Sequence, residues 1–277
     1  TVVPCILPEF AWDCFCSFLG CSAGQSVMRS DSCRGRFMMR RYVRRLFLPV
    51  PLVLLQRCLD ISAGADPEAP EVMLLHAVAG RVTSGGVSAF VLTWECVAFL
   101  LLFLVLYGDF IAEQQRTGAV YRFSRIPSRG PWFCRQVFSL GGYACGYCGI
   151  YVALHGAISA VLSEGACGPR FYGTVLSLWL IFSLIAFGFS VGCNFMCGRF
   201  GASVGIVGIC LTLALAAALS TQLGVPDWVS VVNPASFSET FFTDRAMTLQ
   251  KLGALCLEVL LVTVPAGRYF SGASKKA

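Results

Sequence analysis

Long apolar runs, separated by polar connections, are the main pattern along this chain from residue 47 onwards. There are six of them: Phe47–Ile61, Val87–Tyr107, Val137–Leu162, Phe171–Gly192, Ala202–Leu223 and Leu249–Ala266. A helix needs about 20 apolar residues to cross the hydrocarbon core of a bilayer, where its backbone groups must be paired within the helix. A transmembrane barrel would show short segments of alternating character instead. The pattern therefore predicts an all-α, polytopic membrane protein with six transmembrane helices, of which the first is the shortest.

The composition agrees with this prediction. Hydrophobic residues make up 56% of the 277 residues, charged residues make up 13%, and the mean hydropathy is +0.72. An ordinary soluble domain carries about 25% charged residues. A chain this apolar cannot face water over its whole surface, so lipid must be the solvent for much of it. Six spans within residues 34–277 leave no room for a sizeable soluble domain.

The basic residues predict the orientation. Sixteen of the 21 Lys and Arg residues lie before the first run, between the second and third, between the fourth and fifth, or after the sixth. Cytoplasmic connections carry such an excess of positive charge. With an even number of spans, both termini are expected in the cytoplasm of a cell whose plasma (inner) membrane holds the protein, most simply a bacterium. The net charge of +6 then reflects topology and anionic lipid rather than nucleic acid.

Residues 1–33 form a separate amino-terminal segment. They are moderately apolar but contain Glu9, Asp13, two prolines and several cysteines, and they lack the basic start and clean apolar run of a signal peptide. They fit a membrane-surface or re-entrant segment, a seventh span, or an extension ahead of a natural start at Met28. The six-span domain is expected to occupy residues 34–277.

An amphipathic pattern follows directly in residues 34–47, "RGRFMMRRYVRRLF". Its apolar residues recur at helical spacing, and its arginines occupy the opposite face: Arg40, Arg41, Arg44 and Arg45. This pattern predicts a helix in the inner membrane interface, with the arginines as anchors on lipid phosphates. The alternative is that the arginines only fix the topology.

The connection between the second and third runs is long and carries five arginines. We expect residues 109–116 to continue the second span as a polar helix that breaks at Thr117–Gly118. Residues 119–126 should form a short second helix that ends before Pro127, because proline disfavours helical geometry in the preceding residue. Residues 128–131 should turn the chain, and Trp132 and Phe133 suit the membrane interface. A short helix held between two long ones is a docking surface; the alternative is a solvated loop.

These features resemble the permease subunits of ABC transporters of the second exporter class. The shared elements are an acidic residue after the second span, the sequence Arg116-Thr117-Gly118, a short helix, Pro127-Ser128-Arg129 and an aromatic entry to the third span. Those permeases also have an interfacial helix, six spans, cytoplasmic termini and an outer segment with an Asn-Pro pair, here Asn233-Pro234. The resemblance covers about residues 34 to 270. The amino-terminal segment, the short first span and the many cysteines depart from the pattern.

The resemblance implies two permeases, identical or not, that form the substrate path and bind ABC ATPase subunits. The residues expected to receive the ATPase are Glu113, Arg116, Thr117, Gly118, Arg122, Arg125 and Arg129. The chain has three lysines and none follows a glycine, so the phosphate-loop motif is absent from it. ATP and Mg²⁺ are therefore expected in the partner, and this chain is expected to bind no cofactor and to catalyse no reaction. Nothing selects the cargo.

Ionisable residues inside the apolar runs suggest a second function. Glu95, His155 and Glu258 lie in the second, third and sixth runs, and Arg57 lies near the end of the first. Such residues face protein or water, because a charge in lipid costs at least ~2.5–3.5 kcal/mol. They would line a substrate path or proton relay in a secondary transporter. Alternatively the two glutamates are neutral, or pair with each other, with His155 or with Arg57 across helices, and Arg57 can pair with Asp60.

The cysteines offer a third function. Cys145 and Cys148 have the spacing of a thiol–disulfide exchange motif, as in a membrane oxidoreductase. Most of the 15 cysteines, however, lie in apolar runs or on the cytoplasmic side, where free cysteine acts as a small apolar residue. Cys193 and Cys197 lack nearby histidines, so no metal site is expected there. The glycines in the third and fifth runs should let helices approach closely.

Overall fold

The computed structural model describes Tyr42 and residues 45–62, 69–79, 86–122, 129–163, 167–222 and 245–272. Within these ranges the side chains of residues 59–62, 76, 79, 86–96, 117–122, 217–222, 245–247 and 272 are not described. The chain divides into two compact units, Thr1–Arg44 and Arg45–Ala277. All helices below belong to the second unit. The predictions for residues 1–33 and for Arg40, Arg41 and Arg44, as well as the Asn233-Pro234 pair, lie outside the described residues.

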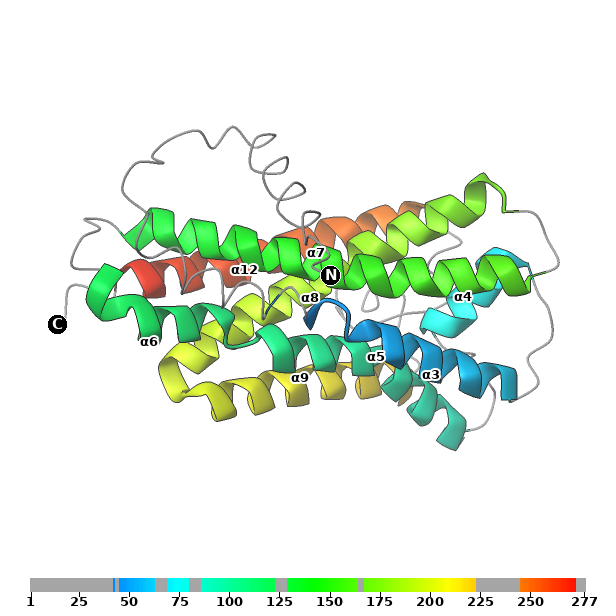
Figure 1. The fold of residues 1–277 in the computed structure, drawn as a ribbon, viewed down its shortest axis with the longest axis horizontal. Coiled ribbons are helices and arrows are strands. Elements are labelled where there is room, and N and C mark those ends of the chain that lie inside the picture. Colours follow the sequence, from blue (N-terminus) through cyan, green and yellow to red (C-terminus); the bar gives the residue numbers. More distant parts are fainter. Residues whose placement is uncertain are drawn as a thin grey trace, which may run out of the picture. The chain divides into compact units, whose positions relative to one another are not determined.

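Every regular element among the described residues is an α-helix, which confirms the all-α prediction (Figure 1). The helices are α3 (Pro49–Ser62), α4 (Pro70–Ala79), α5 (Gly86–Tyr107), α6 (Phe110–Arg122), α7 (Arg129–Leu162), α8 (Pro169–Phe200), α9 (Ala202–Gln222) and α12 (Arg245–Gly272). Three of them begin at a proline, namely Pro49, Pro70 and Pro169. Proline suits the first helical position because the amide it lacks would have no partner there.

Four helices are long and apolar enough to cross a membrane: Val97–Arg116, Arg129–Leu162, Pro169–Phe200 and Thr248–Ser271. They match the second, third, fourth and sixth predicted spans. α3 has only 14 residues, and the part of α9 with described side chains, Ala202–Ala216, is shorter than these four. The structure is thus compatible with a membrane protein, whereas the count of six spans stays a prediction.

Two helices are longer than the sequence pattern predicted. α7 has 34 residues and α8 has 32, so at 1.5 Å per residue they extend about 51 and 48 Å, against about 30 Å of hydrocarbon. The predicted turn at residues 128–131 is therefore wrong from Arg129 onwards, since Arg129, Gly130 and Pro131 form the first turn of α7, where proline is tolerated. α8 ends at Gly201, whose φ of 101° is accessible to glycine without strain.

α4 was not predicted. Its ten residues are too few for a span, and they fall in what the apolar pattern leaves as a connection. Leu74 and Val78 are fully buried, and the helix packs against α7 and also contacts α5 and α8.

Trp132 and Phe133, in the first turns of α7, are buried within the protein. The ring of Phe133 stacks on Phe270 of α12 at 5.4 Å.

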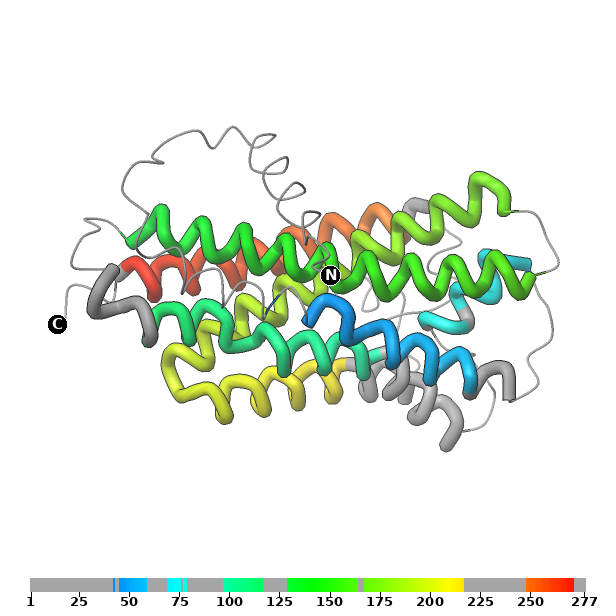
Figure 2. The backbone as a smooth tube through the Cα atoms, in the orientation of Figure 1, coloured from blue at the N-terminus to red at the C-terminus, as the bar shows by residue number. Residues whose placement is uncertain are grey.

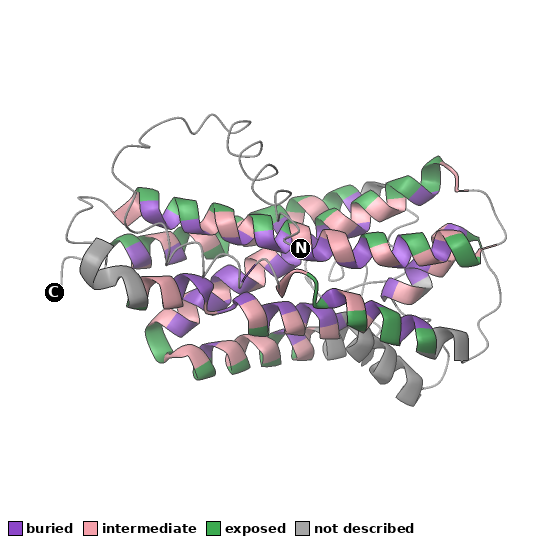
Figure 3. Cartoon of the chain, viewed as in Figure 1, coloured by how far each residue is buried: buried purple, intermediate pink, exposed green. Residues whose placement is uncertain are grey.

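α8 packs against α7, α9 and α12 and also contacts α5 and α6, so it is the common neighbour of the long helices (Figure 2). Figure 3 shows exposed positions along α9, and both α9 and α12 carry exposed large apolar residues. The most exposed of these residues are Val204, Val207, Leu211, Leu215, Leu249, Leu257, Leu260 and Leu261. Such a surface would promote aggregation in water and suits contact with lipid.

Glycine allows close helix approach at some of the predicted positions and not at others. A Cβ atom on Gly205 of α9 would lie 2.5 Å from the backbone nitrogen of Cys197 in α8. A Cβ atom on Gly149 would lie 3.2 Å from Nε1 of Trp179. Gly142 and Gly208 have open space in the part of the chain that the structure describes. The prediction is confirmed for the α8–α9 crossing.

Candidate functional site

The elbow between α5 and α6 is the first part of the candidate site. α5 ends at Tyr107, the chain turns at Gly108–Asp109, and α6 then runs unbroken from Phe110 to Arg122. The predicted break at Thr117–Gly118 is wrong, because α6 runs through both residues. The predicted continuation of the second span to Arg116 is interrupted at the Gly108–Asp109 turn. A glycine inside a helix costs only about 1 kcal/mol relative to alanine, which is too little to end a helix whose start is held firmly.

Asn194 of α8 holds the start of α6. Its Oδ1 accepts hydrogen bonds from the backbone N–H groups of Ile111 (2.5 Å) and Ala112 (3.2 Å). The first N–H groups of a helix have no partner within it, so a side chain must supply one. A nearby residue usually serves as the cap, but here the cap comes from a residue 83 positions away. The path of α6 is therefore set by α8.

The same side chain also holds the end of α5. Nδ2 of Asn194 donates hydrogen bonds to the carbonyl oxygens of Tyr107 (3.2 Å) and Ser190 (2.8 Å). An asparagine amide has two donor hydrogens and two acceptor lone pairs. All four are used, and the side chain is fully buried. One amide thus joins the ends of two helices to a third.

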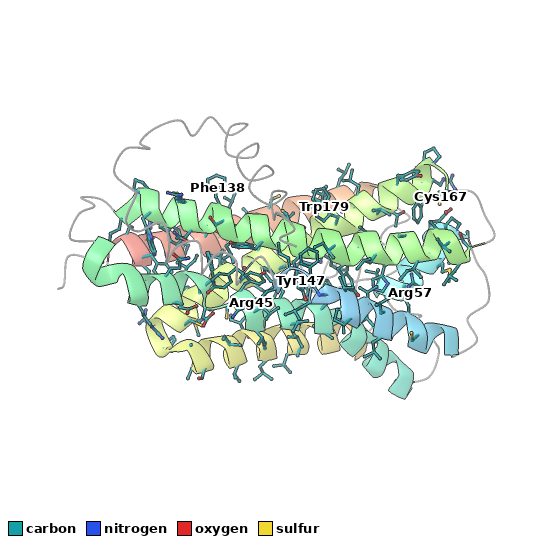
Figure 4. The ribbon with its side chains drawn as sticks, in the orientation of Figure 1. Arg45, Arg57, Phe138, Tyr147, Cys167 and Trp179 are labelled. Carbon is teal, nitrogen blue, oxygen red and sulfur yellow. The ribbon has the colours of Figure 1, made fainter. Side chains whose placement is uncertain are left out.

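Two arginines strengthen this junction. Nη2 of Arg116 donates to the carbonyl oxygen of Cys197 at 3.0 Å, one turn before α8 ends. Nη1 of Arg45 donates to the carbonyl oxygen of Leu106, near the end of α5. Positive charge is favourable at a helix C-terminus, where the carbonyl groups lack partners. Arg45, predicted as a lipid anchor, thus makes this contact inside the second unit (Figure 4).

Gly108 makes the elbow tight. A Cβ atom on Gly108 would lie 2.4 Å from the carbonyl oxygen of Leu104 and 2.6 Å from Sγ of Cys193. Cys193 and Cys197 are buried in adjacent turns of α8, with their sulfur atoms 3.9 Å apart. These two thiols therefore act as small packing residues against Gly108 and Gly205. Among the described residues there is no group of three or more potential metal ligands.

The predicted docking residues are only partly described. Glu113 is half-buried and Arg116 is exposed, and they lie three residues apart on α6. Thr117, Gly118 and Arg122 belong to α6, but their side chains lie outside the described residues, as does Arg125 altogether. Arg129 is the first residue of α7. Sequence reasoning missed Asn194, although a lone amide beside an apolar run signals a buried hydrogen-bonding role.

A buried polar cluster joins α3 and α7 farther along the bundle (Figure 4). Nη2 of Arg57 donates to the carbonyl oxygen of His155 at 3.1 Å and to the hydroxyl of Ser159. Oε1 of Gln56 accepts a hydrogen bond from the hydroxyl of Tyr151 (3.3 Å) and lies 3.2 Å from Nε2 of His155. All five side chains are buried. The sequence pattern suggests His155 and Arg57 as partners of the two glutamates, whereas the structure brings Arg57 to the backbone of His155.

An aromatic ladder connects this cluster with the elbow. Phe99 stacks on Tyr151 with ring centres 4.0 Å apart, Phe103 contacts Tyr147 at 5.1 Å, and Tyr107 stacks on Tyr143 at 5.3 Å. The hydroxyl of Tyr147 also donates to the carbonyl oxygen of Phe99 at 3.0 Å. The signal in the sequence is a tyrosine at every fourth position of α7, which is one face of a helix.

Neither of the two glutamates in the apolar runs has a described contact with this cluster. Glu95 belongs to α5, but its side chain lies outside the described residues. Glu258 is half-buried on α12, two turns beyond the fully buried Lys251, and the two opposite charges attract each other. Arg57 and His155 instead meet between α3 and α7. The side chain of Asp60 is also outside the described residues.

The pair of cysteines with redox spacing lies in the middle of α7. Cys145 is exposed and Cys148 is fully buried, and both are free thiols. The carbonyl oxygen of Cys145 accepts a hydrogen bond from Nε1 of Trp179 at 2.9 Å. A thiol-exchange motif needs an accessible, activated thiolate; Cys148 is not accessible, whereas Cys145 is exposed. The oxidoreductase alternative therefore stays a prediction.

Comparison of the chain with known proteins gives no match to a family model, to a curated protein or to a solved structure.

Proposed function

We propose that this chain is the transmembrane subunit of an ATP-driven exporter, resembling the permeases of the second ABC exporter class. In this proposal α6 and the arginine-rich segment after it form the cytoplasmic surface that a separate ATPase binds. The observation that carries the proposal is the attachment of α6 to α8 through Asn194 and Arg116. A short helix fastened in this way passes a displacement on to a long helix instead of bending alone.

The proposal includes six spans and two cytoplasmic termini. The four long helices would be joined by α9, whose 21 residues extend about 32 Å, and by α3. α3 extends only about 21 Å, so it would cross where the bilayer thins around it or as part of a longer segment. A second permease, identical or related, would complete the substrate path, and the partner would supply ATP and Mg²⁺.

Co-purification tests this proposal. The natural chain should bring down a phosphate-loop ATPase from its own membranes in mild detergent. Glu113→Ala combined with Arg116→Ala should reduce the recovered ATPase at least tenfold, because both positions lie on α6. Arg170→Ala is the matched control, since Arg170 is an exposed arginine at the opposite end of α8. Equal recovery of the ATPase by all three proteins would contradict the proposal.

The buried cluster around Arg57 supports a second candidate function, an ion-coupled secondary transporter. Ionisable residues inside a membrane protein commonly mark ion or substrate paths. In that case, replacing Glu95 and Glu258 by glutamine should abolish transport while any association with an ATPase stays unchanged. In the exporter, the same replacements should leave ATP-driven transport largely intact. Transport assays in vesicles with and without ATP separate the two functions.

A further inference from the structure

The elbow between α5 and α6 has polar contacts with one neighbouring helix and an apolar contact with another. Towards α8, α6 makes three hydrogen bonds: from Ile111 and Ala112 to Asn194, and from Arg116 to Cys197. Towards α7, the ring of Phe110 meets the ring of Tyr143 edge-on at 5.6 Å. Ring contacts tolerate sliding, whereas a hydrogen bond is confined to a narrow range of distance and angle. These hydrogen bonds therefore hold α6 in a fixed position on α8.

Asn194 cannot change its hydrogen-bond partners without leaving a buried backbone group unpaired. Its four hydrogen-bonding positions are occupied, and it is fully buried next to Cys193. In a low-dielectric interior, breaking any of these bonds leaves a backbone group without a partner. Gly108 adds a steric limit, because its backbone lies against the sulfur of Cys193. Both effects keep the elbow fixed on this part of α8.

We propose that Asn194 is a positioning residue that makes α6 and the end of α8 around Cys197 a single rigid unit. A displacement of α6 then moves α8 with it, and through the Gly205–Cys197 contact it also moves α9. The identity of the protein that displaces α6 rests on the proposed function, but the rigid unit itself does not.

Amide hydrogen exchange on the purified chain alone tests this unit. In the unchanged protein, the N–H groups of Ile111 and Ala112 should exchange as slowly as those of α8 around Asn194. The first amides of a helix without a cap exchange quickly, so rapid exchange of these two would overturn the proposal without any variant. This measurement does not depend on an ATPase being found.

Two substitutions distinguish the acceptor role of Oδ1 of Asn194 from the donor role of its Nδ2. Asn194→Leu removes every side-chain hydrogen bond and should speed exchange at Ile111 and Ala112 at least tenfold. Asn194→Asp retains the acceptor for these two amides and should keep them slow, whereas the donor bonds to Tyr107 and Ser190 are lost. Gln136→Leu is the matched control, because Gln136 is another buried amide, on α7, and its loss should leave α6 unchanged. Equal exchange at Ile111 and Ala112 in all four proteins would overturn the proposal.

A functional readout distinguishes positioning from simple stability. Where the chain carries a bound ATPase, Asn194→Leu should leave binding of the ATPase within twofold of the unchanged protein. It should lower the amount of cargo moved per ATP hydrolysed at least fivefold, and Asn194→Asp should restore much of it. Unchanged cargo per ATP in Asn194→Leu would contradict delivery through α8. An absence of any ATPase would count against the proposed function only, since the exchange data decide the rigid unit.

Discussion

Arg57 on α3 and His155 on α7 are joined by a hydrogen bond from the guanidinium to the main-chain oxygen, 3.1 Å long and buried. This bond places a positive charge in the interior of the bundle, where an isolated ion would be strongly destabilising. The same nitrogen also donates to the hydroxyl of Ser159, one turn further along α7. The contact fixes how α3 lies on α7, and its partners can be tested individually.

Removing the hydroxyl that Arg57 contacts should destabilise the protein. In Ser159→Ala a buried guanidinium hydrogen loses its acceptor, which costs about 1–3 kcal/mol. Thermal unfolding in detergent should therefore show a lower midpoint. Ser139→Ala on the same helix is the control, because Ser139 bonds only its own helix, to Arg135, at an exposed position. Equal midpoints for the two variants would contradict the buried contact.

The crossing of α8 and α9 predicts opposite effects of two similar substitutions. Gly205→Ala places a Cβ atom 2.5 Å from the backbone of Cys197, so the helices must separate, at about 1–3 kcal/mol for such overpacking. Gly208→Ala meets open space in the described part of the structure and should stabilise α9 by up to about 1 kcal/mol. Unfolding midpoints of the two variants measure the difference. A stabilising Gly205→Ala would show that the helices are not in close contact.

The turn between α8 and α9 makes a separate prediction. Gly201 has a φ of 101°, a conformation that L-residues with a Cβ atom rarely adopt. Gly201→Ala should destabilise the protein by about 1–3 kcal/mol. Gly168→Ala is the comparison, because Gly168 has a φ of −88° at the start of α8. Unfolding experiments that find the two substitutions equally harmless would contradict this backbone geometry.

The register of the aromatic ladder leads to a prediction about Glu95. Phe99 pairs with Tyr151, and Glu95 is four residues before Phe99 just as His155 is four residues after Tyr151. Among the described residues, Nδ1 of His155 has no hydrogen-bond partner. A double-mutant cycle of Glu95→Gln and His155→Phe should therefore show a coupling energy of about 1 kcal/mol or more.

The control for this cycle replaces Glu95→Gln by Glu258→Gln, since Glu258 lies on α12. Its effect on unfolding should add to that of His155→Phe with little coupling. Additive effects for Glu95 as well would refute the register-based pairing. A secondary transporter would instead lose transport in Glu95→Gln regardless of stability.

The cysteine pair on α7 provides a test of the redox alternative. Cys145→Ser combined with Cys148→Ser should leave the function intact within about twofold, apart from some loss of stability at the buried Cys148 position. The measurement is transport in proteoliposomes, with the free-thiol content determined in parallel. Complete loss of function with an unchanged unfolding midpoint would favour thiol exchange over the exporter.

Sequence reasoning gave the features that depend on long local patterns. The apolar runs predict an all-α chain and match four long helices, because burial in lipid needs many consecutive apolar residues. It failed where tertiary contacts decide. The start of α6 depends on Asn194, and a residue 83 positions distant does not appear in any local pattern. α4 is too short to be separated from a connection by its apolar content.

In the candidate site, too, local sequence patterns predict some features and tertiary contacts determine others. The polar residues after the second apolar run predict that Glu113 and Arg116 lie on a polar helix, and the structure places both on α6. Their attachment to α8 does not, because the acceptor of Arg116 is a main-chain oxygen of Cys197. Backbone acceptors carry no residue identity, so a sequence cannot reveal them.

Cryo-electron microscopy of the complex purified from its natural membranes tests the central proposal most directly. We predict a nucleotide-binding subunit in contact with the face of α6 that carries Glu113 and Arg116, and α8 displaced together with α6 between nucleotide-free and ATP-bound states. A functional transporter whose α6 contacts no second protein in either state would contradict it.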